Sequence, residues 1–146
     1  MARVIVEGLS ESLDAIKAMK AGLDAAAKRI TIRSAAAIEA QAKRNFIGSH
    51  RKGEPHVGGS EPNVVTGYLR RSITHTTATR YLVAAWMSDV GPTAIYGRRI
   101  ELGYTGGGGG RGRQTTKPYP YMAPALRQTS AQLAAIAYEE WSRVTG

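Results

Sequence analysis

Residues 10–46 decide the fold of this chain, and they read SESLDAIKAMKAGLDAAAKRITIRSAAAIEAQAKRNF. Apolar side chains recur there at steps of three, four or seven, the spacing of one face of a helix. Ser10 can cap the amino end by accepting a backbone N–H, and Gly22 either marks a bend or costs some helix stability. The pattern predicts one long helix or two consecutive helices, with an apolar face that packs in the core. That face comprises Leu9, Leu13, Ile16, Leu23, Ala27, Ile30, Ala37, Ile38 and Phe46.

A second long helix is predicted near the carboxyl end, from about Met122 to Val144. Pro124 fits such a helix if it lies in the first turn, where its missing N–H costs nothing. The expected apolar stripe comprises Met122, Leu126, Leu133, Ile136, Trp141 and Val144, with Leu126 anchoring the helix.

Between these helices the sequence predicts a small antiparallel β unit. Residues 73–80 are rich in threonine, and residues 81–90 alternate between β-forming side chains on two faces. Two adjacent strands with a tight reversal near residues 78–81 follow from that pattern.

Short helical segments are expected on both sides of the β unit. In residues 64–73, VVTGYLRRSI, Thr66 can cap a helical turn that directs Tyr68 and Leu69 inward. Residues 93–103, TAIYGRRIELG, predict a short helix that Gly103 ends.

Two segments have the composition of long loops. Residues 48–63, GSHRKGEPHVGGSEPN, are almost free of apolar side chains. Residues 103–120 form a basic arm with five consecutive glycines, and such chain behaves as a flexible coil. The expected fold is therefore α+β, with a single domain over residues 1–146. The long N-terminal helix and the C-terminal helix are expected to pack on the small antiparallel β unit, and two long flexible loops are expected to project from it.

Composition limits the classes of function. The chain has 146 residues, many of its apolar residues are alanine, and such a thin core is often completed by neighbouring subunits. Twenty basic and eleven acidic side chains give a net charge of +9, concentrated in residues 48–121 with ten basic and four acidic. This charge favours docking onto an acidic protein surface, with DNA phosphates as the other interpretation. No apolar run approaches the length of a membrane span, so we expect a soluble protein without membrane contact.

The sequence argues against an enzyme and predicts no cofactor and no metal site. Cysteine is absent, which excludes disulfides and thiolate chemistry. His50 and His56 lie in the first loop without a rigid scaffold, and solvated loop histidines are the simpler interpretation. The GGGGGRGR run at residues 106–113 lacks the Gly-Lys-Ser/Thr end and the following helix of a phosphate-binding loop.

Three short motifs follow one another along the chain. They are TGYLRRSI at residues 66–73, AIYG with IELG at residues 94–103, and YPYMAPAL at residues 119–126. In this order they resemble the tail-completion or tail-component proteins of long-tailed bacteriophages, a neck family that includes head–tail joining proteins. The resemblance covers the layout of about residues 1–145, although Gly97 stands where alanine is commoner and the arm is unusually rich in glycine.

The resemblance implies a structural virion protein of the phage neck or tail, assembled in the host cytoplasm. It implies a closed homo-oligomeric ring, expected to be a hexamer, that completes the tail and joins it to the head. Expected partners are further copies of the chain, the tail-tube protein and head connector or portal-side neck proteins, with DNA in the lumen as a further contact. The alternative is a small basic DNA-binding or packaging accessory protein.

Candidate interface residues fall into two groups. Subunit or partner contacts are expected from the aromatic and charged side chains of the second and third motifs, where Glu101 could pair with an arginine of the same or a neighbouring subunit. This first group comprises Tyr96, Arg98, Arg99, Glu101, Tyr119 and Tyr121. Contacts from the basic loop and arm are expected from Arg51, Lys52, Arg111, Arg113 and Lys117.

Overall fold

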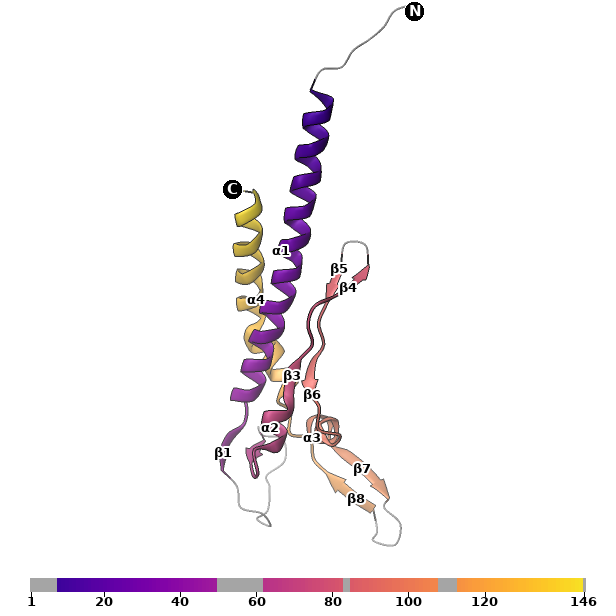
Figure 1. Ribbon diagram of the computed structural model, residues 1–146. Coiled ribbons are helices and arrows are strands. Elements are labelled where there is room, and N and C mark those ends of the chain that lie inside the picture. Colours follow the sequence, from indigo (N-terminus) through magenta and orange to yellow (C-terminus); the bar gives the residue numbers. More distant parts are fainter. Residues whose placement is uncertain (1–7, 50–61, 83–84, 108–112, 146) are drawn as a thin grey trace, which may run out of the picture.

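The computed structural model describes residues 8–49, 62–82, 85–107 and 113–145, and Figure 1 shows their arrangement. The fold is α+β, with a long N-terminal helix, a C-terminal helix and small sheets, as the sequence predicts. The helices are α1 (Leu9–Arg44), α2 (Tyr68–Ser72), α3 (Gly97–Leu102) and α4 (Met122–Thr145). The strands are β1 (Ile47–Ser49), β2 (Asn63–Val64), β3 (Ile73–His75), β4 (Thr79–Leu82), β5 (Ala85–Met87), β6 (Val90–Pro92), β7 (Tyr104–Gly107) and β8 (Arg113–Thr116).

Helices α1 and α4 lie side by side and run in opposite directions (Figure 1). Small side chains let them approach closely: Ala26, Ala35 and Ala42 of α1 are buried, as is Ala125 of α4. At Gly22 an added Cβ would lie 2.9 Å from a methyl carbon of Val144. Gly22 therefore makes room for the end of α4, and α1 continues through it without interruption.

The first turns of α1 extend beyond α4 and are uncovered (Figure 1). Every side chain described from Ser10 to Ala21 is exposed, including Leu13 and Ile16, with Ile16 at 63%. The prediction that these two residues pack in the core is therefore wrong for the single chain. The cause is length, because α1 has 36 residues and α4 only 24.

The predicted Ser10 cap is also wrong, since α1 begins after Gly8, a residue with a left-handed φ of +80° and no capping side chain.

A buried carboxylate joins the two long helices. The side chain of Glu140 is 2% exposed and accepts hydrogen bonds from Arg29 Nε at 2.6 Å, Arg33 Nη1 at 2.6 Å and Arg143 Nη1 at 3.2 Å. The hydrogen bond from Arg29, followed by that from Arg33, holds the pKa of Glu140 below the ordinary glutamate range. Because a buried charge is tolerated only when it is paired, this cluster fixes the register of α1 on α4.

Glu140→Gln is expected to lower the melting temperature at pH 7, because it removes the charge that three guanidinium groups share. A carboxylate with a depressed pKa stabilises the fold above its unfolded pKa, about 4.3, and this stability is lost as pH falls through the folded value. The difference in melting temperature between wild type and Glu140→Gln should therefore shrink below about pH 4. Thermal melts followed by circular dichroism measure it. Glu139→Gln is the matched control, since that side chain is 45% exposed and should matter less. A difference that is unchanged at pH 3 would contradict this account.

The main hydrophobic core lies at the base of the molecule, where α1 ends and α4 begins. Phe46, Ile73 and Tyr121 are buried there together with Ala42 and Ala125. The rings of Phe46 and Tyr121 lie 5.0 Å apart, centroid to centroid, in a tilted arrangement. Val64, Leu69, Ile100 and Met122 pack around this cluster, so it joins α1, α2, β3, α3 and α4.

The β unit consists of two short antiparallel pairs in succession. Strand β3 pairs with β6, with Thr74 opposite Gly91, and β4 pairs with β5, with Arg80 opposite Trp86. The antiparallel unit is confirmed, but the predicted reversal near residues 78–81 is wrong, because β4 occupies Thr79–Leu82 and the chain turns after it. Trp86 explains this register: its Nε1 donates to Asp24 of α1 at 3.1 Å, and the guanidinium of Arg80 lies 4.8 Å from its ring centroid.

Both segments predicted as loops contain paired strands at their ends. In the glycine-rich arm, β7 and β8 form an antiparallel ribbon in which Tyr104 is opposite Thr116. A flexible coil over all of residues 103–120 is therefore wrong, because the β-forming residues that flank the glycines pair with one another. At the ends of the first loop, β1 and β2 pair in parallel, while residues 50–61 lie outside the described part.

No helix in the described part of the chain combines the length and apolarity needed to cross a membrane.

Candidate partner-binding cleft

The second and third motifs meet where α3 lies against the start of α4. Glu101 of α3 accepts hydrogen bonds from the backbone N–H groups of Tyr121 (2.7 Å), Met122 (2.9 Å) and Ala123 (2.9 Å). These are among the amides that a helix leaves without internal partners, and a carboxylate also complements the positive end of the helix dipole. Glu101 is thus the cap of α4, and its predicted pairing with an arginine is replaced by this contact.

Tyr121 is a core residue in this chain, contrary to its predicted role as a contact for a partner. Its side chain is 0% exposed, and its hydroxyl donates to the carbonyl of Gly97 at 3.1 Å. Its carbonyl accepts from Asn45 Nδ2 at 3.0 Å, just after the end of α1. Burial, with smaller contributions from Glu101 and Tyr96, raises the pKa of the Tyr121 hydroxyl well above its ordinary value. The raised pKa keeps the hydroxyl protonated at neutral pH, so it can donate the hydrogen bond to Gly97.

Gly97 begins α3 at a point of very close packing. An added Cβ would lie 2.4 Å from Cγ of Pro92, 2.8 Å from its Cβ and 3.1 Å from the Tyr121 hydroxyl. Glycine at this position is thus a packing requirement of the junction between β6, α3 and α4.

Beside this junction a cleft of about 720 Å³ opens at the base of the molecule. One wall is residues 62–70, the other is residues 115–119, and Phe46, Leu69 and Ile100 contribute apolar side chains. Arg70 and Lys117 line the cleft, and among the described residues that line it there is no carboxylate. The remaining described residues of the lining are Pro62, Asn63, Val64, Val65, Thr66, Gly67, Tyr96, Thr115, Thr116 and Tyr119. The cleft is therefore apolar inside and basic at two points.

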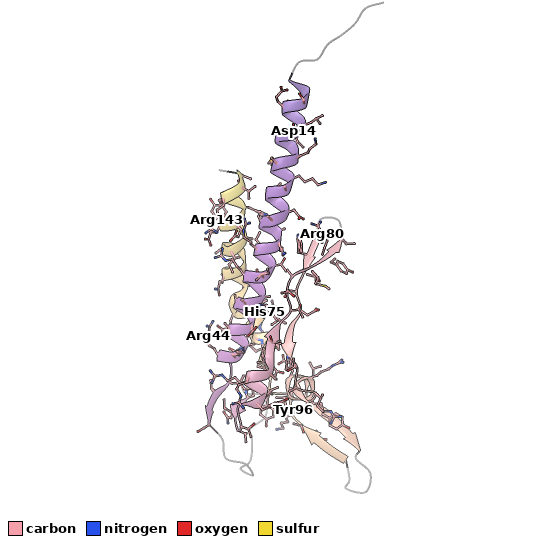
Figure 2. The ribbon with its side chains drawn as sticks, in the orientation of Figure 1. Asp14, Arg44, His75, Arg80, Tyr96 and Arg143 are labelled. Atoms are coloured by element: carbon pink, nitrogen blue, oxygen red, sulfur yellow. The ribbon has the colours of Figure 1, made fainter. Side chains whose placement is uncertain are left out.

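Three of the predicted interface residues lie in this cleft: Tyr96, Tyr119 and Lys117. Tyr96, labelled in Figure 2, precedes α3, and its ring centroid lies 6.3 Å from that of exposed Tyr68. Tyr119 is half-buried, and its backbone N–H donates to the carbonyl of Ile100 at 2.8 Å. The structure thus brings together residues that are more than 20 positions apart in the sequence.

The other predicted residues lie outside the cleft. Arg98 and Arg99 are exposed on α3, and the guanidinium of Arg99 lies 4.6 Å from the ring centroid of Tyr104. Arg113 belongs to strand β8. The remaining three, Arg51, Lys52 and Arg111, lie outside the described residues.

Titratable groups gather at a second place, between α1 and β3. His75 Nδ1 and Lys43 Nζ each lie 2.5 Å from a carboxylate oxygen of Glu39. Burial works to raise the pKa of Glu39, but the hydrogen bonds from Lys43 and His75 outweigh it and lower the pKa below the ordinary range. His75 thus joins β3 to α1, while His50 and His56 lie outside the described residues. Among the described residues, no group of three or more histidine, aspartate or glutamate side chains is placed to hold a metal ion.

Sequence reasoning did not identify the cleft itself. The first wall, residues 62–70, follows a loop that was predicted only from its polar composition. The second wall, residues 115–119, was predicted to be flexible coil. One usable signal was present, because Thr115 and Thr116 are β-branched residues beside a glycine run.

No protein-family model matches the sequence, and no curated protein or solved structure matches it.

Proposed function

We propose that this chain is a non-enzymatic structural protein of the neck of a long-tailed bacteriophage, where it assembles into a ring that completes the tail and joins it to the head. The observation that carries the proposal is an apolar stripe on α1 that the single chain leaves uncovered. On the first turns of α1, Leu13, Ile16 and Met19 are all exposed at steps of three residues. Exposed apolar patches of this kind are typical of surfaces that bind other proteins.

The spatial arrangement of the three motifs also supports the proposal. Ile73 of the first motif and Tyr121 of the third are buried in one cluster, and Glu101 of the second caps the helix that the third begins. The three motifs thus lie in one structural unit, which agrees with the proposal that they act together.

The expected outcome is concentration-dependent assembly into closed rings. Purified protein should be followed by multi-angle light scattering over a concentration series and imaged in negative stain at each step. Rings of uniform diameter would support the proposal, and a sixfold ring is expected. A chain that stays monomeric at every concentration, alone and with tail-tube protein added, would contradict it.

The second candidate is a DNA-binding or packaging accessory protein, which the net charge of +9 favours. Such a protein should bind duplex DNA with an affinity that falls steeply with salt, because each neutralised phosphate releases a counterion. A fluorescence titration with a 30-base-pair duplex at several salt concentrations separates the two. Tight, strongly salt-dependent binding by a monomer would favour this candidate, and weak binding by assembled rings would favour the neck protein.

A further inference from the structure

The cleft at the base lies between β2 and β8, and among the described residues each of these strands has one edge without a strand neighbour. Asn63 and Val64 of β2 line one wall, and Thr115 and Thr116 of β8 line the other. In the described part of the chain β2 pairs only with β1, and β8 pairs only with β7. Free strand edges beside an apolar floor are the features that bind an extended peptide, through backbone hydrogen bonds and buried side chains.

We propose that the amino-terminal segment of a second copy, residues 1–7, occupies this cleft as an added strand. The segment reads MARVIVE, and its three consecutive β-branched residues, Val4, Ile5 and Val6, favour extended backbone. Their side chains would fill the apolar floor. The segment carries one basic residue, Arg3, and one acidic residue, Glu7, which would supply a carboxylate where the lining offers Arg70 and Lys117.

The length of α1 shows that the donor must be a different copy. A helix of 36 residues is about 54 Å long, and the cleft contains Phe46, which follows the end of that helix. Seven extended residues reach at most about 25 Å, so the segment cannot return to the cleft of its own chain. Figure 1 shows the amino end of α1 and the elements of the cleft at opposite ends of the molecule.

Such a contact joins unlike surfaces, the amino end of one copy and the base of the next. Contacts of this head-to-tail type close into rings or continue as filaments. The exposed stripe of Leu13, Ile16 and Met19 continues from the same end of the chain, so the added strand would bring it against the neighbouring copy. The inference rests on the self-association in the proposed function and names the surfaces that carry it.

Engineered disulfides test the contact directly, because the natural chain has no cysteine. Full-length Ile5→Cys protein is mixed with full-length Thr115→Cys protein carrying a larger tag, and the mixture is mildly oxidised. Thr79→Cys is the matched control for Thr115→Cys, since Thr79 is also an exposed strand residue but does not line the cleft. A mixed dimer should appear on a non-reducing gel at about ten times the control level or more, because disulfides form only between closely placed Cβ atoms. Mixed dimers at the control level would overturn the inference.

A double variant carrying both Ile5→Cys and Thr115→Cys extends the test to the type of assembly. Oxidation should produce a ladder of cross-linked species that ends at the size of the ring. In addition, Ile5→Asp should have the wild-type melting temperature at concentrations where both proteins are monomeric, but should remain monomeric where wild type associates. Assembly of Ile5→Asp at the wild-type concentration would overturn the inference.

These outcomes separate the inference from the proposed function. Rings in negative stain without the specific cross-link would overturn the strand contact while self-assembly remains supported. The specific cross-link with open filaments and no rings would support the contact but contradict the ring proposed for the neck.

Discussion

Gly97→Ala is expected to destabilise the protein by about 1–3 kcal/mol, the usual cost of forcing an extra methyl group into a packed core. The methyl carbon would lie 2.4 Å from Cγ of Pro92 and 3.1 Å from the Tyr121 hydroxyl. Pro92 of β6 cannot move to another rotamer, because its side chain is closed onto its own backbone nitrogen. Tyr121 is held in place by burial and by the hydrogen bond from its hydroxyl to the carbonyl of Gly97. Strand β6, helix α3 or the Tyr121 ring would therefore have to shift.

The control for this prediction is Gly91→Ala, one residue before Pro92. An added Cβ at Gly91 meets no atom within 4 Å, so the variant should match wild type or gain up to about 1 kcal/mol from a stiffer unfolded chain. Urea denaturation followed by circular dichroism gives both values. Equal stability of the two variants would show that the packing around Gly97 is looser than the distances indicate.

Glu101→Ala is expected to cost about 2 kcal/mol, at the upper end of the range for the loss of a helix cap. Three backbone N–H groups at the start of α4 would lose their acceptor together, next to the buried cluster of Tyr121 and Ala125. Since charged acceptors form the stronger hydrogen bonds, Glu101→Gln should recover only part of the loss.

Thermal melts and amide hydrogen exchange at Met122 and Ala123 measure this effect, with Glu11→Ala as the matched control. Glu11 is exposed in the first turn of α1, and its removal should leave the melting temperature unchanged. Wild-type stability and wild-type exchange in Glu101→Ala would show that Glu101 is not the cap.

The sequence predicted the long helices well, because a 3.6-residue period sustained over many turns has few other interpretations. The predicted bounds of Ser10–Phe46 and Met122–Val144 compare with Leu9–Arg44 and Met122–Thr145 in the structure. The buried face of α1 was predicted less well. The deepest contacts are made by Ala26, Ala35 and Ala42, and a hydropathy pattern gives alanine less weight than leucine.

The site was harder to predict, because its contacts join residues that are distant in the sequence. Glu101 caps a helix that begins 21 residues later, and nothing near Glu101 in the sequence shows that the start of α4 lies beside it. Tyr121 resembled an exposed aromatic in a proline-rich stretch, but its neighbours in space are Phe46 and Ile73. The β reversal was misplaced because a threonine-rich run fits several registers, and Trp86 with Asp24 selects one of them.

The pairing of α1 with α4 also determines the order in which the chain can fold. The Arg29–Glu140 contact joins residues 111 positions apart, so it can form only after residue 140 has been synthesised. The short antiparallel pairs are local and can form early, whereas α4 is the last of the described elements to be synthesised. Until α4 is complete, the alanine face of α1 remains in contact with water. The hydrophobic core at the base, which includes residues of α4, is also incomplete in a growing chain. In the assembly that we propose, folding of each subunit would therefore precede its association.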